Sequence, residues 1–299
     1  MYSAPVPQML FTLRHVIGLG RISALPGQDG LADLLEPVLG EAAKLAEGVL
    51  APLNTVGDKS GGKWADGSVT TAPGWKDAYN AYRDGGWNAV PFSTDHGGQG
   101  LPWTIAFPVQ EMWQAANMAF GLCPLLNQGA VEAIAHHGHP DQKEYYLPKL
   151  VSGEWTGTMN LTEPQAGSDL AAVRSKAERN GDGTYKIFGS KIFITYGEHD
   201  LADNIIHLVL ARLPDGPAGV KGISLFIVPK FLKDGTRNDV VCASIEHKLG
   251  IHGSPTCTMS FGEKGGAIGY LVGQEHEGIK YMFTMMNNAR LSVGIQGLA

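Results

Sequence analysis

The residues with the clearest capacity for chemistry form one run near the middle of the chain, Thr162–Asp169, with the sequence TEPQAGSD. Pro164 stiffens this turn, and Gly167 lets another group approach the backbone closely. Ser168 offers a hydroxyl and a backbone N–H to an anion, while the Thr162 hydroxyl is able to bond a heteroatom of a flat ring. The simpler interpretation, which would hold for an isolated Gly-Ser-Asp, is a polar loop that caps a turn.

A second segment, 189–195 with the sequence GSKIFIT, predicts a strand that carries Phe193 and Thr195. The aromatic ring either packs on the face of a flat cofactor or is an ordinary half-buried strand residue. Taken alone, the segment favours the ordinary strand residue. In the last helical segment, Arg290 follows Asn287 by three positions. The guanidinium fork suits a phosphate, and a salt bridge on the helix surface is an equally good interpretation.

These segments together resemble the acyl-CoA dehydrogenase superfamily. The flavin signature of that family has Thr-Glu-Pro followed by Ala-Gly-Ser-Asp, and all seven residues occur here in order around Gln165. The segment 189–195 is similar to the family strand Gly-x-Lys-x-Trp-Ile-Thr, with Phe193 in place of the tryptophan. The turn at 248–254, KLGIHGS, resembles Lys-Leu-Gly-x-x-x-Ser, with His252 in a turn where the family usually has an arginine. We assign His252 no catalytic role, because a lone histidine is more often structural.

The resemblance covers the chain from about residue 35 onward and implies an FAD-dependent enzyme that removes two hydrogens across Cα–Cβ of an acyl-CoA thioester. It implies that FAD binds to Met159, Leu161, Thr162, Gly167, Ser168, Phe193 and Thr195. Ser168 and Arg290 would also contact the acyl-CoA substrate. Within the superfamily, the opening MYSAP and the run 196–201 most resemble the 3-methylmercaptopropionyl-CoA dehydrogenase branch. An acyl-CoA oxidase, a non-catalytic flavin or CoA binder and a DNA-associated relative are the alternatives.

The catalytic base of the family is a glutamate in a second helical domain, which would lie beyond residue 299. We therefore expect this chain to be a fragment that lacks its base and is inactive alone. Glu163 is the nearest carboxylate in sequence, but its place in the turn predicts a structural role. We also expect such a fragment to expose an apolar face of its last helix, including Met282, Met285 and Met286.

Composition excludes several other classes. The chain has 29 acidic and 23 basic residues, and its net charge of −6 disfavours nucleic acid as a main partner. The sequence has no Gly-x-Gly-x-x-Gly loop that opens a β-α unit, so we do not expect a nicotinamide as the primary redox cofactor. Neither a secretory signal nor an uninterrupted apolar run of the ~18 residues needed for a membrane span is visible. Three scattered cysteines, at 123, 242 and 257, suit a reduced cytoplasmic setting. The resemblance implies an electron-transfer flavoprotein as acceptor and a homo-oligomer when full length.

Two histidine-containing segments receive structural interpretations. His136, His137 and His139 follow one another near a helix end, but adjacent helical residues point apart, so we expect no metal site. The run Glu198-His199-Asp200 follows the flavin strand, and we expect it to be a loop that anchors the β domain.

The pattern of apolar residues predicts an α+β fold. Helical periodicity runs from Pro37, in a first turn, to Pro52, and an exposed loop is expected at 57–74. Further helices are predicted near 75–84, 103–118, 125–137 and 140–151. Strands are predicted at 185–188, 192–195, 205–210, 223–228 and 240–244, in an antiparallel barrel or sandwich. The predicted domains are an all-α domain at 1–154, a middle β domain at 155–276 and, at 277–299, the first helix of a truncated C-terminal helical domain.

Overall fold

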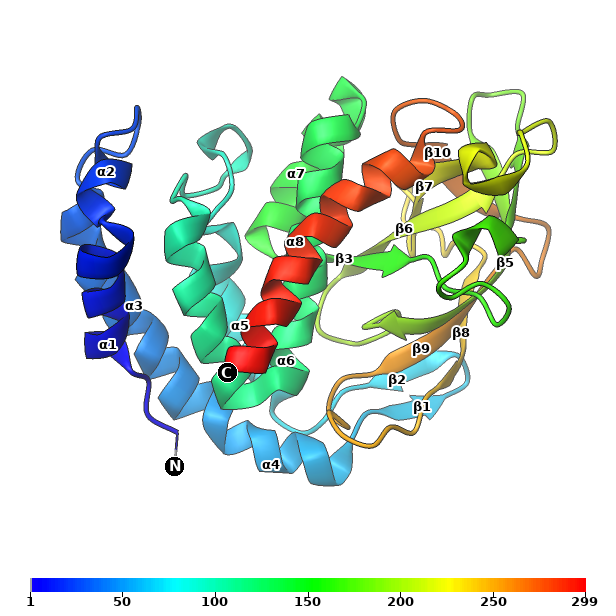
Figure 1. The fold of residues 1–299 in the computed structure, drawn as a ribbon. Helices are drawn as coiled ribbons and strands as arrows, with labels where there is room; N and C mark the ends of the chain where they lie inside the picture. The colour runs from blue at the N-terminus through cyan, green and yellow to red at the C-terminus, as the bar shows by residue number, and fades with distance from the viewer. Residues whose placement is uncertain (1) are drawn as a thin grey trace.

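The computed structural model describes residues 2–299 (Figure 1). Helices fill the chain as far as Ser152, strands dominate from Trp155 to Leu271, and one long helix follows, which confirms the predicted α+β class. The helices are α1 (Val6–Phe11), α2 (Leu19–Ser23), α3 (Leu31–Leu45), α4 (Ala51–Ser60), α5 (Trp75–Asp84), α6 (Trp103–His137), α7 (Pro140–Ser152) and α8 (Gly278–Leu298). The strands are β1 (Lys63–Ala65), β2 (Ser68–Thr70), β3 (Trp155–Asn160), β4 (Lys176–Arg179), β5 (Tyr185–Thr195), β6 (Asn204–Arg212), β7 (Ile223–Pro229), β8 (Val240–Ile245), β9 (Thr256–Phe261) and β10 (Ala267–Leu271).

The chain from Leu31 to Ser60 is helical throughout, because a π-helical turn, Ala46–Leu50, joins α3 to α4. Pro37 lies inside α3, so the prediction that it opens a helix is wrong. Pro52 lies just after the π-helical turn, and the helix continues past it to Ser60, so the prediction that Pro52 ends the helix is wrong.

The segment 57–74, predicted as a loop, contains the end of α4 and an antiparallel hairpin of β1 and β2. The turn between the two strands has positive φ at Asp66 and at Gly67, 49° and 79°. Positive φ at both central residues is typical of the hairpin turn whose twist matches that of the strands. The side chains of β1 are all exposed, which explains why this hairpin has a polar, loop-like composition.

Helix α6 contains both helices predicted between 103 and 137. A break at Asn117, with φ −161° and ψ 86°, separates them, and the Asn117 Oδ1 accepts a hydrogen bond from the Phe120 N–H at 3.1 Å. That bond caps the second half, which therefore begins before the predicted residue 125. By length and composition α6 would suit a membrane span, but 78% of the relevant window is buried inside the molecule.

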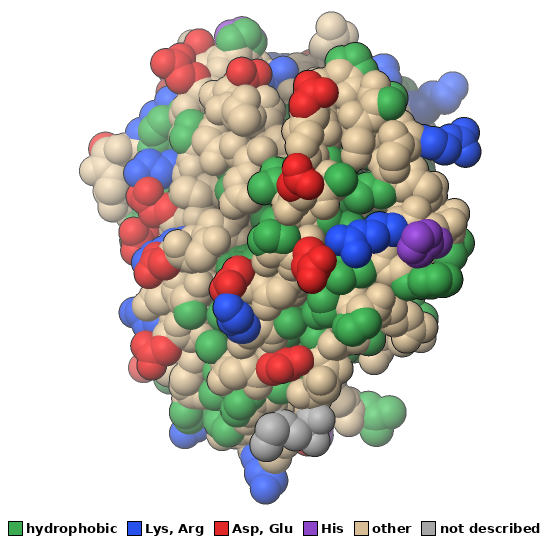
Figure 2. All heavy atoms as spheres, turned by 90° about the vertical axis from the view of Figure 1, so that its left-hand side faces the viewer, with side chains coloured by type: hydrophobic (Ala, Val, Ile, Leu, Met, Phe, Trp, Pro, Cys, Tyr) green, Lys and Arg blue, Asp and Glu red, His purple; other side chains and the backbone are tan. Residues whose placement is uncertain are grey.

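The main sheet curls into a barrel, because β10 pairs with both β7 and β5. Most neighbours are antiparallel, as predicted, but β3 runs parallel to β6 over six residue pairs. A parallel pair needs a long connection, and the chain from 161 to 203 provides it. The helices α6 and α7 pack against β3, and α8 lies along α6 and β7 (Figure 1). The face formed by α1 to α3 carries scattered acidic side chains without a broad basic patch (Figure 2).

The packing of α8 corrects one expectation. Met282 and Met285 are fully buried between α8 and the rest of the chain, and a Cβ added to Gly129 of α6 would lie 2.8 Å from Met285 Cγ. The methionine face of α8 is thus covered by the N-terminal helices, and Met286 is half-buried. The exposed apolar side chains of α8 are Phe283, Leu291, Val293 and Leu298.

Gly57 allows α4 to pack directly on Trp75, which is fully buried and donates a hydrogen bond to the Tyr196 hydroxyl at 3.1 Å. A Cβ at Gly57 would lie 2.1 Å from the indole ring. We predict that Gly57→Ala destabilises the protein by about 1–3 kcal/mol, because a rigid ring cannot yield in a packed core. Gly48→Ala is the matched control, since Gly48 is helical and has no neighbour within 4 Å. Urea unfolding should show no destabilisation for the control; equal effects would refute the steric account.

Candidate functional site

The loop Leu161–Asp169 follows β3 directly. One of its residues, Glu163, anchors it to the interior, with a side chain that is only 3% exposed. One carboxylate oxygen accepts from Lys191 Nζ at 2.8 Å, from the Ser175 hydroxyl at 2.6 Å and from the Ser175 N–H at 3.0 Å. The other accepts from the Arg174 N–H at 2.7 Å and from the Gln165 amide. A buried carboxylate with so many donors is fixed in place.

These contacts also fix the charge of Glu163. Burial disfavours the ionised carboxyl, but the charge of Lys191 and the donated hydrogen bonds outweigh burial and lower the pKa of Glu163 to about 2. Burial lowers the pKa of Lys191 to about 8, with the Glu163 carboxylate opposing that shift. Both groups are therefore charged near neutral pH. A carboxylate with so low a pKa is a poor proton acceptor, which supports the predicted structural role of Glu163.

Lys191 ties the loop to strand β5. Its ammonium group also donates to the Leu161 carbonyl at 3.0 Å, and the neighbouring Ile192 N–H donates to the Thr162 carbonyl at 2.9 Å. The first and second predicted flavin segments are thus hydrogen-bonded to each other. Sequence reasoning did not single out Lys191; the available signal was a lysine within an otherwise apolar strand segment.

A β-bulge turns Phe193 outward. The pairing of β5 with β9 matches Lys191 to Met259 and then Ile194 to Cys257, so one extra residue lies on β5. Phe193 has a left-handed φ of 59°, an unfavourable conformation for a bulky residue, and its side chain is 59% exposed. A large exposed ring held in a strained conformation next to the Thr162 loop is a surface on which a flat aromatic group can stack.

The other predicted residues surround this surface less directly. Met159 is half-buried on β3, and Thr195 is half-buried opposite Thr256 of β9. Gly167 and Ser168 are exposed, and a Cβ at Gly167 would meet nothing within 4 Å, so the protein itself does not require a glycine there.

Arg290 is exposed on α8 and donates to Asn287 of the same helix at 2.8 Å. Among residues 2–299, no hydrogen bond links Ser168 or Arg290 to Thr162 or Phe193. Their roles toward a bound ligand remain predictions.

The three histidines near the end of α6 have separate partners, as expected for helix neighbours. His136 Nε2 lies 3.3 Å from Glu132, His137 Nε2 lies 2.6 Å from the Thr284 hydroxyl, and His139 Nδ1 lies 3.7 Å from Asp141. Burial lowers the pKa of His137, so its ring is neutral at physiological pH.

The segment 198–200 anchors the barrel. Glu198 is buried and forms ion pairs with Lys230 and with Arg237, the latter at 3.2 Å. His199 Nε2 donates to the Thr156 hydroxyl of β3 at 2.9 Å, because its Nδ1 accepts from the Leu201 N–H. Burial lowers the pKa of His199 to about 3, which keeps the ring neutral. This agrees with the anchoring role predicted for the segment.

Comparison with known proteins identifies the family to which this chain belongs. Residues 45–154 match the family model described as the acyl-CoA dehydrogenase N-terminal domain, and residues 158–263 match the middle domain of the same family. The chain belongs to the acyl-CoA dehydrogenase family. A 3-methylmercaptopropionyl-CoA dehydrogenase of Ruegeria pomeroyi is 47% identical, over all of this chain and 51% of the relative. A butyryl-CoA dehydrogenase of Syntrophomonas wolfei is 43% identical over 84% of this chain and 43% of the relative.

Solved structures agree with the sequence comparison. Butyryl-CoA dehydrogenase of Megasphaera elsdenii superposes with a TM-score of 0.73 at 28% identity, covering 89% of this chain and 65% of that one. A Caenorhabditis elegans protein, ACDH-11 in complex with C11-CoA, shares the fold with a TM-score of 0.81 at 18% identity, over all of this chain and 51% of that one. The chain spans about half the length of the curated relatives it matches.

The Lys191–Glu163 pair gives the prediction for this site. Lys191→Met retains the length of the side chain and leaves the Glu163 charge buried without its cation, so we expect a loss of about 3–5 kcal/mol in the free energy of unfolding. Lys280→Met is the control, because Lys280 is 70% exposed in its pair with Glu277 and an exposed ion pair contributes little to stability. Urea unfolding of both variants tests this. A Lys191→Met protein as stable as the control variant would show that the pair does not hold the loop.

Proposed function

We propose that this chain carries the flavin-facing half of an FAD-dependent acyl-CoA dehydrogenase, acting on an acyl-CoA thioester of the 3-methylmercaptopropionyl-CoA type. The observation that carries the proposal is the hydrogen-bonded junction between the Thr162 loop and the Lys191–Phe193 segment. Two segments far apart in sequence, each similar to a flavin motif, meet at one exposed aromatic ring. The relative from Ruegeria pomeroyi supports the substrate class.

The residues present fit a flavin. Phe193 offers the face of its ring, and the Thr162 and Thr195 hydroxyls lie on the two segments that meet there. Exposed Gly167 and Ser168 leave room for a phosphate or a pantetheine chain along the loop. FAD, when bound, supplies the acceptor for the hydride from Cβ. The protein would hold and orient the ring, and its hydrogen-bond donors would polarise the thioester carbonyl.

The proton from Cα requires a base within hydrogen-bond reach. Glu163 cannot serve, because its carboxylate is buried beneath the loop and its pKa is lowered to about 2. We propose that the base lies outside residues 1–299, as the family resemblance implies. We further propose a cytoplasmic homo-oligomer that passes electrons to an electron-transfer flavoprotein. All three cysteines are buried and free, which supports a reducing compartment.

The experiment that tests the proposal is a titration of the 299-residue protein with FAD, followed by flavin fluorescence and absorbance. We expect saturable binding that Phe193→Ala weakens, because the stacking surface is lost. Adding an acyl-CoA should leave the flavin band unbleached, because the base is absent. A protein that ignores FAD would overturn the cofactor proposal, and bleaching by substrate would show that a base does lie within the chain.

Thr162→Val tests the hydroxyl separately from the shape of the loop. We expect FAD still to bind, about fivefold more weakly, since one hydrogen bond contributes ~1 kcal/mol net. Thr70→Val, at an exposed threonine of β2, is the matched control and should leave the dissociation constant unchanged. Identical constants for wild type and Thr162→Val would remove this hydroxyl from the site.

A further inference from the structure

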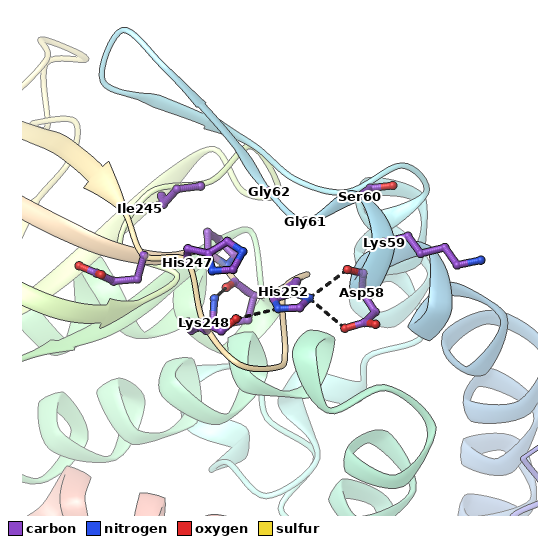
Figure 3. A pocket seen from close by; sticks show the side chains of 12 residues that line it. Asp58, Lys59, Ser60, Gly61, Gly62, Ile245, His247, Lys248 and His252 are labelled. Carbon is purple, nitrogen blue, oxygen red and sulfur yellow. Dashed lines mark hydrogen bonds and ion pairs between the residues drawn. The ribbon is translucent and has the colours of Figure 1, made fainter.

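The cleft between α4 and the β8–β9 connection contains a histidine with an unusual set of partners. The cleft has a volume of 480 Å³ and is lined by the end of α4 and by residues on both sides of the turn 248–254 (Figure 3). His252 Nδ1 lies 3.1 Å from the Asp58 carbonyl oxygen and 3.1 Å from Asp58 Oδ1. His252 Nε2 lies 2.8 Å from the Lys248 carbonyl oxygen.

These partners determine the protonation state of the ring. A carbonyl oxygen only accepts hydrogen bonds, and a neutral imidazole has only one N–H to donate. Both ring nitrogens of His252 face carbonyl oxygens, so both contacts exist together only when the ring carries two protons and a positive charge. The hydrogen bonds to the Lys248 and Asp58 carbonyls accordingly raise the pKa of His252 above its ordinary value.

The position of the ring favours the same charge. The Asp58 carbonyl belongs to the last turn of α4, and the negative end of a helix dipole attracts a cation there. The charged groups that surround the ring are Asp58 and Lys59 from α4 and Glu246, His247 and Lys248 from the β8–β9 connection. Asp58 is the one in ion-pair contact with His252. The His247 ring lies 5.8 Å from the His252 ring, so two positive rings there would repel each other weakly.

The turn that His252 holds leads into β9, which pairs with the end of the predicted flavin strand. The Pro255 carbonyl accepts a hydrogen bond from the Tyr196 N–H at 2.8 Å, and Thr256 pairs with Thr195. A Cβ at Gly253 would lie 2.8 Å from the Trp75 ring, so the turn packs tightly at its end. At its tip, by contrast, Leu249 is fully exposed and Ile251 adopts a left-handed φ of 49°.

We infer that protonated His252 is a positioning residue that clamps the β8–β9 turn to the C-terminus of α4, and that the clamp releases when the ring loses a proton. Neutral His252 keeps one N–H, so either the Asp58 or the Lys248 carbonyl loses its partner. The clamp is then closed below the pKa of His252 and open above it. Release loosens the turn 248–254 first and, through Pro255 and Thr256, the end of β5.

Trypsin provides a direct readout, because its cleavage site at Lys248–Leu249 lies inside the clamped turn. We expect the cleavage rate at this bond, normalised to the rate for a free peptide of residues 244–254, to rise roughly two- to fivefold between about pH 6 and about pH 8.5. A factor of this size corresponds to the stabilisation that a positive charge typically gives at a helix C-terminus. Mass spectrometry of the intact protein without FAD gives the rate.

Three variants separate charge from shape. His252→Arg keeps a permanent cation with several donors and should be cleaved slowly at every pH, whereas His252→Gln should be cleaved quickly at every pH. His247→Gln, the control at the neighbouring exposed histidine, should retain the wild-type pH dependence. A histidine NMR titration of the wild type, assigned by the signal that His252→Arg removes, should show both ring nitrogens protonated and a pKa above the ordinary value.

A cleavage ratio that does not change with pH in the wild type, or an ordinary pKa for His252, would overturn the clamp. The same would follow if His252→Gln kept the wild-type pH dependence. The connection to the flavin rests on the proposed function and has its own measurement. Between about pH 6 and about pH 7.5, below the pKa of about 8 at Lys191, the FAD dissociation constant should rise with pH in the wild type and stay constant in His252→Arg. A protein that shows the pH-dependent cleavage but binds no FAD would retain the clamp and refute the cofactor.

Discussion

The buried ion pair between Lys191 and Glu163 is the constraint on which the arrangement of the site depends. Neither charge is tolerable alone in a position with at most 3% exposure, so the loop after β3 and the middle of β5 must meet at one place. A buried pair of this kind adds little net stability compared with apolar packing, but it allows only one register. A slip of β5 by a single residue would turn Lys191 toward solvent and strand the Glu163 carboxylate in the interior.

The bulge at Phe193 follows from the same constraint. Strict alternation along β5 would place Lys191, Phe193 and Thr195 on one face and Ile192 and Ile194 on the other. The structure buries Lys191 and also Ile194, three positions later, which alternation cannot do. One residue must therefore be unpaired, and the chain meets this need by placing Phe193 in a left-handed conformation with its ring outside the barrel. The inward lysine and the outward aromatic ring are two results of one packing requirement.

Much of this fold could be predicted from periodicity, and the failures have local causes. Strands β6 to β8 were predicted because segments rich in Val, Ile, Phe and Thr are separated by turn residues, whereas the two strands predicted at 185–188 and 192–195 form the single strand β5. Pro37 and Pro52 misled the helix boundaries, because the helix continues through both residues, with a π-helical turn between them. The parallel pairing of β3 depends on β6, over forty residues away, and no local signal encodes it. For the same reason the burial of Met282 and Met285 under α6 could not be read from α8 alone.

The sequence proposed the residues of the candidate site, but it did not predict the contacts that support them. The motif named the loop and the aromatic strand; it did not reveal that Lys191 joins them or that His252 braces the far end of the same strand. The two supports differ physically. The Lys191–Glu163 pair is shielded from water, so salt leaves it intact, and both charges persist between the pKa of Glu163, about 2, and the pKa of Lys191, about 8. His252 is 31% exposed and bonds carbonyl groups that water can also satisfy, so its hold on the turn is weaker and depends on one proton. The strand between them is thus rigid where it meets the Thr162 loop and adjustable where its end pairs with the residues that follow the His252 turn.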